Sequence, residues 1–302
     1  MGADGAYGSA PDVATARQGD ESVIELDGVP QLTDPVLIAA FEGWNDAGEA
    51  ATAAIEQLER EWRATPLATL DPDDYYDFQV NRPVVSLDDS GVRSLEWPTT
   101  RLSVASVPGS RHDIVLLRGI EPNMRWRGFC SELLGVAAEL GVERVITLGA
   151  LLADVPHTRP VPVSMSASNP AQATVLGLET SRYEGPTGIV GVFQDAATRA
   201  GLDAVSLWAA VPHYVGQSPC PKATLVLMQH IEDLLDVAVP MGELAEQAEA
   251  WQHGVDELAE EDEDIAEYVR RLEEARDTVD LPEASGEHIA REFERYLRRR
   301  DK

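Results

Sequence analysis

Short apolar runs alternate with amphipathic stretches along most of the chain. Runs of buried-strand length lie at residues 35–44, 82–87, 100–107, 113–120, 142–153, 187–193 and 203–211. Apolar residues at helical spacing predict helices over 45–62, 122–140, 194–200 and 221–238. Because strands and helices alternate, the pattern favours an α/β fold whose largely parallel sheet is covered by helices on both faces.

The character of the chain changes near Pro240. Residues 241–302 contain 20 acidic and 9 basic residues, a local net charge of −11. Helical spacing continues there over 241–258, 265–279 and 286–300. We therefore predict a disordered tail over 1–22, an α/β domain over 23–240 and an acidic helical extension over 241–302.

The charge balance narrows the classes of partner. The chain has 24 basic and 53 acidic residues, a formal net charge of −29. Phosphate backbones and anionic lipid surfaces repel such a protein, so we expect neither nucleic acid nor membrane as a partner. The N-terminal stretch lacks the basic start and apolar core of a signal peptide, and no apolar run approaches the roughly 18 residues of a membrane span. These features predict a cytoplasmic protein.

Metal and cofactor chemistry has little support in the sequence. The two cysteines, Cys130 and Cys220, form neither a disulfide framework nor a metal-binding pattern. The spaced glycines of 184–191 lack the Gly-Lys-Ser/Thr of a phosphate-binding loop and the order of a dinucleotide fingerprint. We therefore predict no metal and no cofactor. Cys220, which lies between two prolines beside Lys222, is a candidate reactive thiol.

Four predicted strands end in polar loops, at residues 42–48, 118–127, 153–160 and 211–224. In a parallel sheet these loops gather at one edge, where ligands bind. That edge would bring together the side chains of Glu42, Asn45, Asp46, Arg118, Glu121, Asn123, Arg127, Asp154, His157, Arg159, His213 and Lys222. Such a set could serve a hydrolase or a phosphate-binding site.

The sequence Val-Pro-His ends two of these runs, at 155–157 and 211–213. In a catalytic interpretation, Asp154 orients His157 as a base, and His213 faces it. In a structural interpretation, each proline ends a strand and each imidazole only hydrogen-bonds a backbone carbonyl. No Gly-x-Ser-x-Gly nucleophile motif supports the first, and the sequence leaves both open.

The catalytic interpretation also assigns roles to the basic side chains. Arg118, Arg127 and Arg159 would hold an anionic substrate. Lys222 is the first basic residue of a predicted helix, where the helix dipole disfavours a cation, so its amine could point back into the site.

Several motifs, taken in order, resemble the proteasome assembly chaperone family, type two, and above all its long actinobacterial branch. They are FEGWNDAG, NRP at 81–83, RGIEPNMRWR, LGALLADVPHTRPVPV, YEGPTGIVG and VPHYVGQSPCPKAT. The resemblance covers about residues 23–240. It implies a three-layer α/β sandwich similar to the phosphorylase/hydrolase-like fold of nucleoside phosphorylases, and a homo-oligomer.

The resemblance also implies a function without catalysis, because eukaryotic and archaeal relatives help to build proteasome core particles. Relatives that dock on proteasomes often end in a hydrophobic residue, tyrosine and any residue. This chain ends in Arg300, Asp301 and Lys302 instead, and Tyr296 lies too far from the end.

We therefore expect a non-catalytic assembly chaperone-like protein whose partners are proteasome subunits or another multi-subunit client. The alternative is a small-ligand-binding protein, or a hydrolase or phosphorylase-like enzyme that acts on an anionic or nucleoside-like compound at the strand-end loops.

Overall fold

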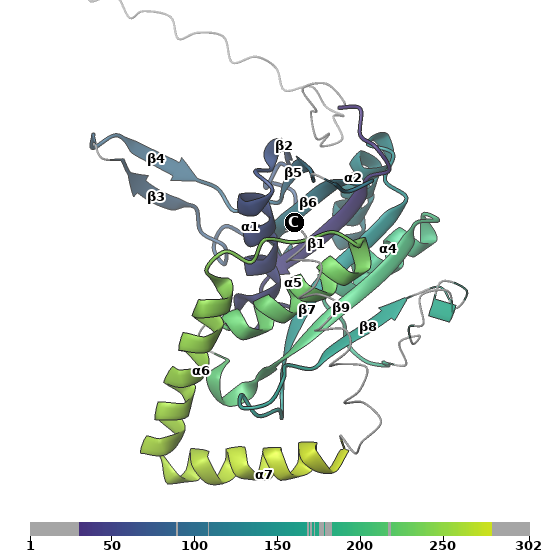
Figure 1. The fold of residues 1–302 in the computed structure, drawn as a ribbon. Coiled ribbons are helices and arrows are strands. Elements are labelled where there is room, and N and C mark those ends of the chain that lie inside the picture. Colours follow the sequence, from purple (N-terminus) through teal and green to yellow (C-terminus); the bar gives the residue numbers. More distant parts are fainter. Residues whose placement is uncertain are drawn as a thin grey trace, which may run out of the picture.

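The computed structural model describes residues 30–88, 90–107, 109–167, 169, 171, 173–174, 178, 183–216 and 219–279. The predicted tail over 1–22, the predicted helix over 286–300 and the C-terminal residues lie outside this part of the chain. Figure 1 shows a sheet with helices packed around it, a projecting hairpin and two C-terminal helices.

A seven-stranded mixed sheet forms the centre, in the order β2-β5-β6-β1-β7-β9-β8. Its strands are β1 (Val36–Glu42), β2 (Thr65–Thr69), β5 (Arg101–Ser106), β6 (Asp113–Ile120), β7 (Arg144–Ala153), β8 (Val163–Ala167) and β9 (Asp203–Pro212). The central strands β6, β1, β7 and β9 run parallel, as predicted. The outer strands β2, β5 and β8 pair antiparallel, so the sheet is mixed rather than largely parallel.

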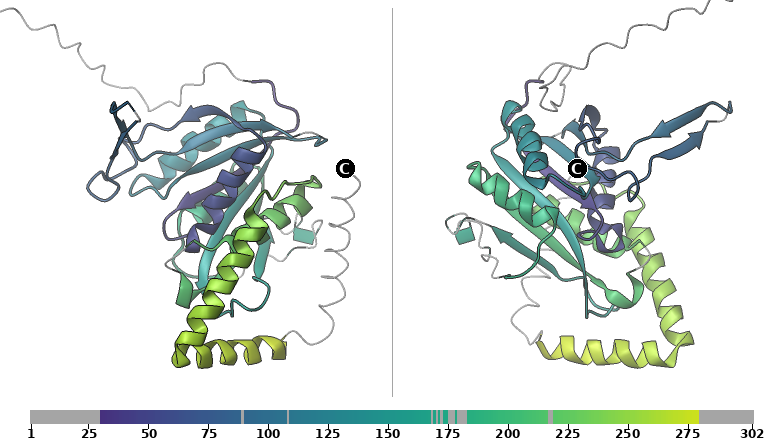
Figure 2. Two further views of the ribbon diagram at one scale, coloured as in Figure 1. Left: turned by 60° about the vertical axis from the view of Figure 1, so that its left-hand side comes forward. Right: turned by 180° about the vertical axis from the view of Figure 1, so that it is seen from behind.

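Helices cover both faces of this sheet, as the alternation predicted (Figure 2). Along β1, Ile38 and Ala40 join one core with α1 (Ala50–Glu61) and α5 (Pro221–Leu235). The neighbouring Ala39 and Phe41 join the other core, with α2 (Trp126–Glu139) and α4 (Ile189–Arg199). Because successive side chains of a strand point to opposite faces, an all-apolar strand such as β1 supplies both cores.

One predicted strand is wrong in type, and another is confirmed as a strand but lies outside the main sheet. Residues 187–193 begin helix α4, because Ile189, Val190 and Phe193 recur at helical spacing and all pack into one core. The run at 82–87 forms β3 (Val84–Leu87), which pairs with β4 (Arg93–Glu96) outside the main sheet.

The β3–β4 hairpin projects from the domain, as Figures 1 and 2 show. Val85 lies opposite Leu95, and Leu87 lies opposite Arg93, so these four side chains share one face of the hairpin. Val85, Leu87 and Leu95 are 46%, 69% and 48% exposed. The hairpin therefore presents an apolar face that nothing in the described chain covers.

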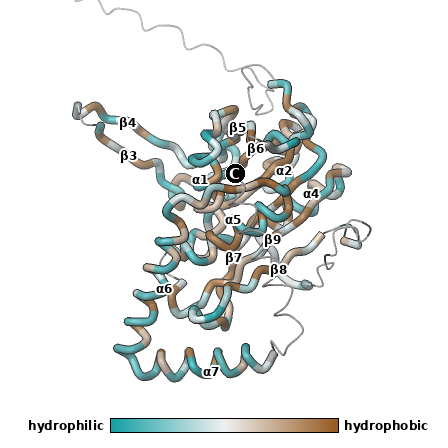
Figure 3. Tube along the Cα trace, in the orientation of Figure 1, coloured by the Kyte–Doolittle hydropathy of each residue, from teal (hydrophilic) through white to brown (hydrophobic). Residues whose placement is uncertain are grey.

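The C-terminal arm consists of α6 (Leu244–Glu261) and α7 (Glu263–Val279). Helix α6 packs on α5, and the chain turns at Asp262, whose backbone is extended. Figure 3 shows that α7 is largely hydrophilic, in contrast to the central strands. The predicted acidic extension is thus mostly helical up to residue 279. No helix among the described residues is long and apolar enough to cross a membrane.

Candidate functional site

The carboxyl ends of β1 and β7 open into a pocket of about 950 Å³. After β1, the chain continues into helix α1, which covers one face of the sheet. After β7, it continues through β8 to helix α4, which covers the other face. Such a divergence between neighbouring parallel strands leaves a crevice where ligands bind in α/β proteins. We call this crevice the strand-end pocket. Its lining residues are 43–49, 151, 152, 164–166, 183, 186–188, 191, 194, 208 and 216.

Asp46 supports one wall of the strand-end pocket by capping helix α1, as the sequence predicted for Asn45 or Asp46. Its carboxylate accepts hydrogen bonds from the Ala51 N–H at 2.7 Å, the Thr52 N–H at 3.3 Å and the Thr52 hydroxyl. Burial raises the pKa of Asp46 to about 6, against the opposing effect of these donors. Both oxygens of this carboxylate therefore accept hydrogen bonds from the first turn of α1.

Asn45 connects the wall to helix α4. Its side-chain amide donates to Glu121 Oε1 at 2.8 Å, and the same oxygen accepts the Ile189 N–H at the start of α4, also at 2.8 Å. Gly188 is required at this junction, because a Cβ there would collide with the Asn45 amide. Glu121 thus caps α4 from another strand-end loop.

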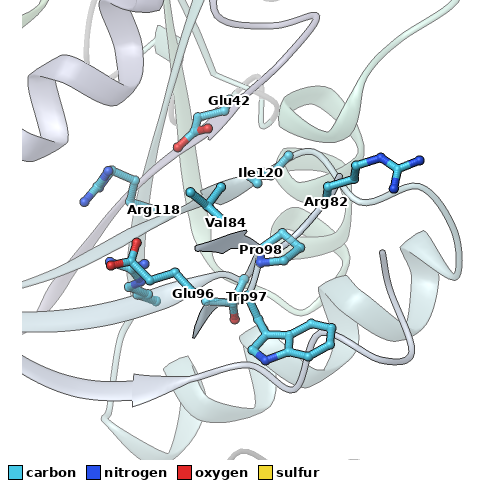
Figure 4. Close-up of a pocket in the computed structure, with 11 residues that line it drawn as sticks. Glu42, Arg82, Val84, Glu96, Trp97, Pro98, Arg118 and Ile120 are labelled. Atoms are coloured by element: carbon cyan, nitrogen blue, oxygen red, sulfur yellow. The ribbon is translucent and has the colours of Figure 1, made fainter. Parts of the chain in front are cut away.

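Glu42 and Arg118 lie beside a second, smaller pocket of about 180 Å³ at the base of the hairpin (Figure 4). Arg118 forms an ion pair with Glu56 at 2.6 Å and approaches Glu59 at 3.4 Å, so α1 holds its guanidinium. Burial raises the pKa of Glu42, and the Arg118 charge opposes this. The arginine predicted to bind an anion is therefore already neutralised.

Two predicted ligands on the loop 118–127 lie outside both pockets. The Asn123 side-chain oxygen accepts hydrogen bonds from the Asp77 N–H at 2.7 Å and from Asn81 Nδ2 at 2.9 Å, so it fixes a neighbouring loop. Arg127 is exposed in the first turn of α2.

His157, at the end of the first Val-Pro-His segment, is buried between Tyr214, which follows the second segment, and helix α6 of the C-terminal arm. Its Nδ1 lies 2.7 Å from the Tyr214 hydroxyl, which also accepts the backbone N–H of His157 at 2.8 Å. Its Nε2 lies 2.9 Å from Asp256 Oδ1 on α6. The hydroxyl proton then points to Nδ1, and Nε2–H donates to Asp256, which is the pattern of a neutral imidazole. Burial lowers the pKa of His157 in the same direction.

The Lys222 side chain points back toward the strand-end loops, as predicted, but it lines neither of the two pockets. Its ammonium donates to the carbonyl oxygens of His157 and Arg159 at 2.5 and 3.0 Å and to Gln252 Oε1 on α6 at 2.7 Å. Burial lowers the pKa of Lys222. The lysine therefore connects one strand-end loop to the arm.

Arg159 and Asp154 face the other helix of the arm. The Arg159 guanidinium binds both carboxylate oxygens of Asp277 on α7, at 2.9 and 2.7 Å, and Glu273 at 3.1 Å. Asp154 accepts from the Tyr268 hydroxyl at 3.0 Å and lies 3.2 Å from His213 Nδ1. Asp154 therefore partners His213, and Asp256 takes the place beside His157 that the sequence analysis gave to Asp154.

The structure thus brings together Asp154, His157, Arg159, His213 and Lys222, but as a joint between the α/β domain and the arm. We call these residues with their partners on 252–277 the arm joint. The arm partners, among them Gln252, Asp256 and Tyr268, were missed because a charged helical stretch gives no sign of which residues face the domain. None of the five strand-end residues lines the strand-end pocket.

The structure also bears on the candidate thiol Cys220 and on possible metal ligands. Cys220 is fully buried at the start of α5, and burial raises the pKa of its thiol to about 11, so it lacks the environment of a reactive cysteine. Among the described residues, no group of three or more His, Cys, Asp or Glu side chains could hold a metal ion.

With fold and site in view, comparison with known proteins assigns the family. The model of the PAC2 family matches residues 40–259, which include the sheet except the first four residues of β1, the strand-end loops and most of α6. The chain belongs to the PAC2 family. No curated protein sequence matches this PAC2-family chain.

Several solved structures are similar to this chain. A Streptomyces avermitilis PAC2-family protein is 63% identical, with a TM-score of 0.74, and the match covers 78% of this chain and all of that one. A Mycobacterium tuberculosis protein, described as a proteasome-assembly chaperone homologue, is 56% identical with a TM-score of 0.71, over 78% and 99% of the two chains. PbaB of Pyrococcus furiosus, an archaeal proteasome activator, shares the fold at 18% identity and a TM-score of 0.64, over 79% and 98%.

Proposed function

We propose that this PAC2-family protein is a non-catalytic assembly chaperone that binds proteasome core-particle subunits. The observation that carries the proposal is the uncovered apolar face of the β3–β4 hairpin, formed by Val85, Leu87 and Leu95. An isolated two-stranded hairpin is marginally stable in water, so burial against a partner stabilises it. The Mycobacterium tuberculosis relative, described as a proteasome-assembly chaperone homologue, supports the choice of partner.

Two further features support an interaction rather than catalysis. Five of the ionisable side chains that the enzyme alternative needs are engaged in the arm joint, with His157 buried and Lys222 half-buried against α6. Arg118 is paired with Glu56 on α1 instead. The net charge of −29 steers the protein toward basic surfaces and away from other acidic ones. The homo-oligomer stays a prediction that the same experiment examines.

The experiment uses purified α and β subunits of an actinobacterial proteasome core. Native mass spectrometry follows the formation of complexes and half-particles with and without the full-length protein. We expect a defined complex of the protein with α or β subunits, faster appearance of half-particles, and release of the protein from the finished core. The same spectra give the oligomeric state of the free protein.

The hairpin is tested with the double variant Leu87→Ser/Leu95→Ser. Leu258→Ser is the matched control, because Leu258 is 53% exposed on α6, away from the hairpin. We expect the hairpin variant to bind subunits about tenfold more weakly, since two exposed leucines contribute on the order of 1–2 kcal/mol on burial, and the control to bind normally. Absence of any complex between the unchanged protein and either subunit would contradict the proposal.

A further inference from the structure

The strand-end pocket has the dimensions of a small-molecule site. Its volume of about 950 Å³ lies within the range of roughly 300–1,000 Å³ that such sites occupy. It lies outside the carboxyl ends of the parallel strands, where α/β folds bind ligands. The arm joint and the hairpin face supply none of its described lining residues. Neither the arm joint nor the hairpin face therefore accounts for this pocket.

The charge of the pocket disfavours an anionic ligand, one of the two ligand classes that the alternative interpretation of the sequence named. Among its described lining residues are the carboxylates of Asp46 and Glu49, and there is no arginine, lysine or histidine. Helices α1 and α4 begin at its wall, but Asp46 already accepts the N–H groups of Ala51 and Thr52, and Glu121 accepts that of Ile189. Phosphate or carboxylate would find no counter-charge among these residues, and a protein carboxylate already accepts N–H groups at the start of each helix.

Aromatic and aliphatic side chains supply the apolar part of the lining. Trp44 and Tyr183 are 69% and 66% exposed, which is unusual for such large rings in a folded protein. Leu152, from the end of β7, is 51% exposed. The Trp208 ring lies so close to β7 that a Cβ on Gly149 would be 2.7 Å from it. Flat rings on a ligand can stack on such surfaces.

Uncommitted polar groups occur beside these apolar side chains. Ser164 and Ser166 project from β8, and Gln194 projects from α4. Within the described chain, none of these three side chains forms a hydrogen bond to protein. A few such groups in a mostly apolar lining are typical of sites that orient a small organic ligand.

We propose that the strand-end pocket binds a small planar organic compound that is uncharged or cationic. The ring stacks on exposed aromatic side chains such as Trp44, and a cationic group of the ligand lies near Glu49 at the rim. This binding is independent of subunit assembly, because the residues concerned differ from those of the hairpin.

The test uses three indoles that share one ring and differ in charge: tryptamine is cationic, indole is uncharged, and indole-3-acetate is anionic. Saturation-transfer NMR and titration calorimetry measure their binding to the full-length protein. We expect tryptamine and indole to bind, and indole-3-acetate to bind at least about tenfold more weakly than tryptamine. Glu49→Gln should weaken the binding of tryptamine and leave the binding of indole unchanged.

The location is tested with Trp44→Ala, which removes an exposed ring without disturbing a core. Trp97→Ala is the matched control, because Trp97 is also an exposed tryptophan but lines the smaller pocket. We expect about a tenfold loss of tryptamine affinity for Trp44→Ala, from lost stacking and cation–π attraction, and none for Trp97→Ala. The assignment is overturned if no indole binds, if indole-3-acetate binds as well as tryptamine, or if the two variants behave alike.

Discussion

His157 Nε2 lies 2.9 Å from Asp256 Oδ1, although the two residues are 99 positions apart in the chain. The imidazole is 1% exposed and is enclosed by Tyr214 on its other side. A histidine that looked like a catalytic base in the sequence is therefore a buried connector between a strand-end loop and the C-terminal arm. Arg159 in the same loop and Lys222 at the start of α5 also contact the arm, through Asp277 and Gln252.

Removing the Asp256 carboxylate should loosen the arm. Asp256→Ala leaves the buried Nε2–H of His157 without an acceptor, which costs about 1–3 kcal/mol. We expect faster hydrogen–deuterium exchange in α6 and α7 and little change in the sheet. Glu257→Ala is the control, because Glu257 is exposed and pairs with the exposed His253 on its own helix, at 3.5 Å. Equal exchange in the two variants would show that the His157 contact does not hold the arm.

Asp46 should make stability depend on pH in the mildly acidic range. Its pKa rises from 3.8 to about 6 in the folded protein, so the folded state binds the proton more tightly than the unfolded state. Stability from this group is therefore present below about pH 4 and lost as pH rises through about 6. A difference of about two pH units corresponds to about 3 kcal/mol.

The measurement compares Asp46→Asn with the unchanged protein by urea unfolding at several pH values. The asparagine oxygen still accepts the N–H groups of Ala51 and Thr52 but carries no charge. We expect the variant to gain about 2–3 kcal/mol relative to the unchanged protein between pH 4 and pH 7. A relative loss over that interval would mean that the three hydrogen bonds outweigh burial.

Gly149 should tolerate no side chain. A Cβ there would lie 2.7 Å from the half-buried Trp208 ring, so the ring or the strand would have to shift. We expect Gly149→Ala to lower the free energy of unfolding by about 1–3 kcal/mol, as overpacking does. Gly135→Ala in α2 is the control. Apart from its own helix backbone, no atom of the described residues lies within 4 Å of a Cβ at this position, so the variant should be neutral or stabilised by about 0.5–1 kcal/mol. Chemical denaturation of both variants checks this.

Cys220 should be inert in the folded protein. Burial raises the pKa of its thiol to about 11, so little thiolate exists at neutral pH, and the sulfur is not accessible. We expect iodoacetamide to modify neither Cys220 nor the equally buried Cys130 until urea is added. Ser164→Cys is a positive control, because position 164 is exposed. Rapid labelling of Cys220 in the folded protein would contradict this prediction and show that the thiol is reactive.

The local pattern of the chain determined most of the elements. The segments that form β1, β6, β7 and β9 are apolar at most successive positions, which is typical of strands buried on both faces. They therefore indicate the parallel centre of the sheet from the sequence alone. The capping role expected at 45–46 and the stripes of α2 and α5 depend on neighbours a few residues away. Such short-range effects are readable from sequence because the helix or strand itself sets the geometry.

Only the tertiary structure decided what the polar residues do. Whether His157 meets Asp154 or Asp256, and whether Arg159 meets a substrate or Asp277, depends on where a helix more than 90 residues away is placed. The projecting hairpin and the strand-end pocket likewise depend on how elements pack, and periodicity carries no information about that. Burial then set the chemistry, because a histidine or lysine enclosed by partners loses the proton affinity and access that it has in water.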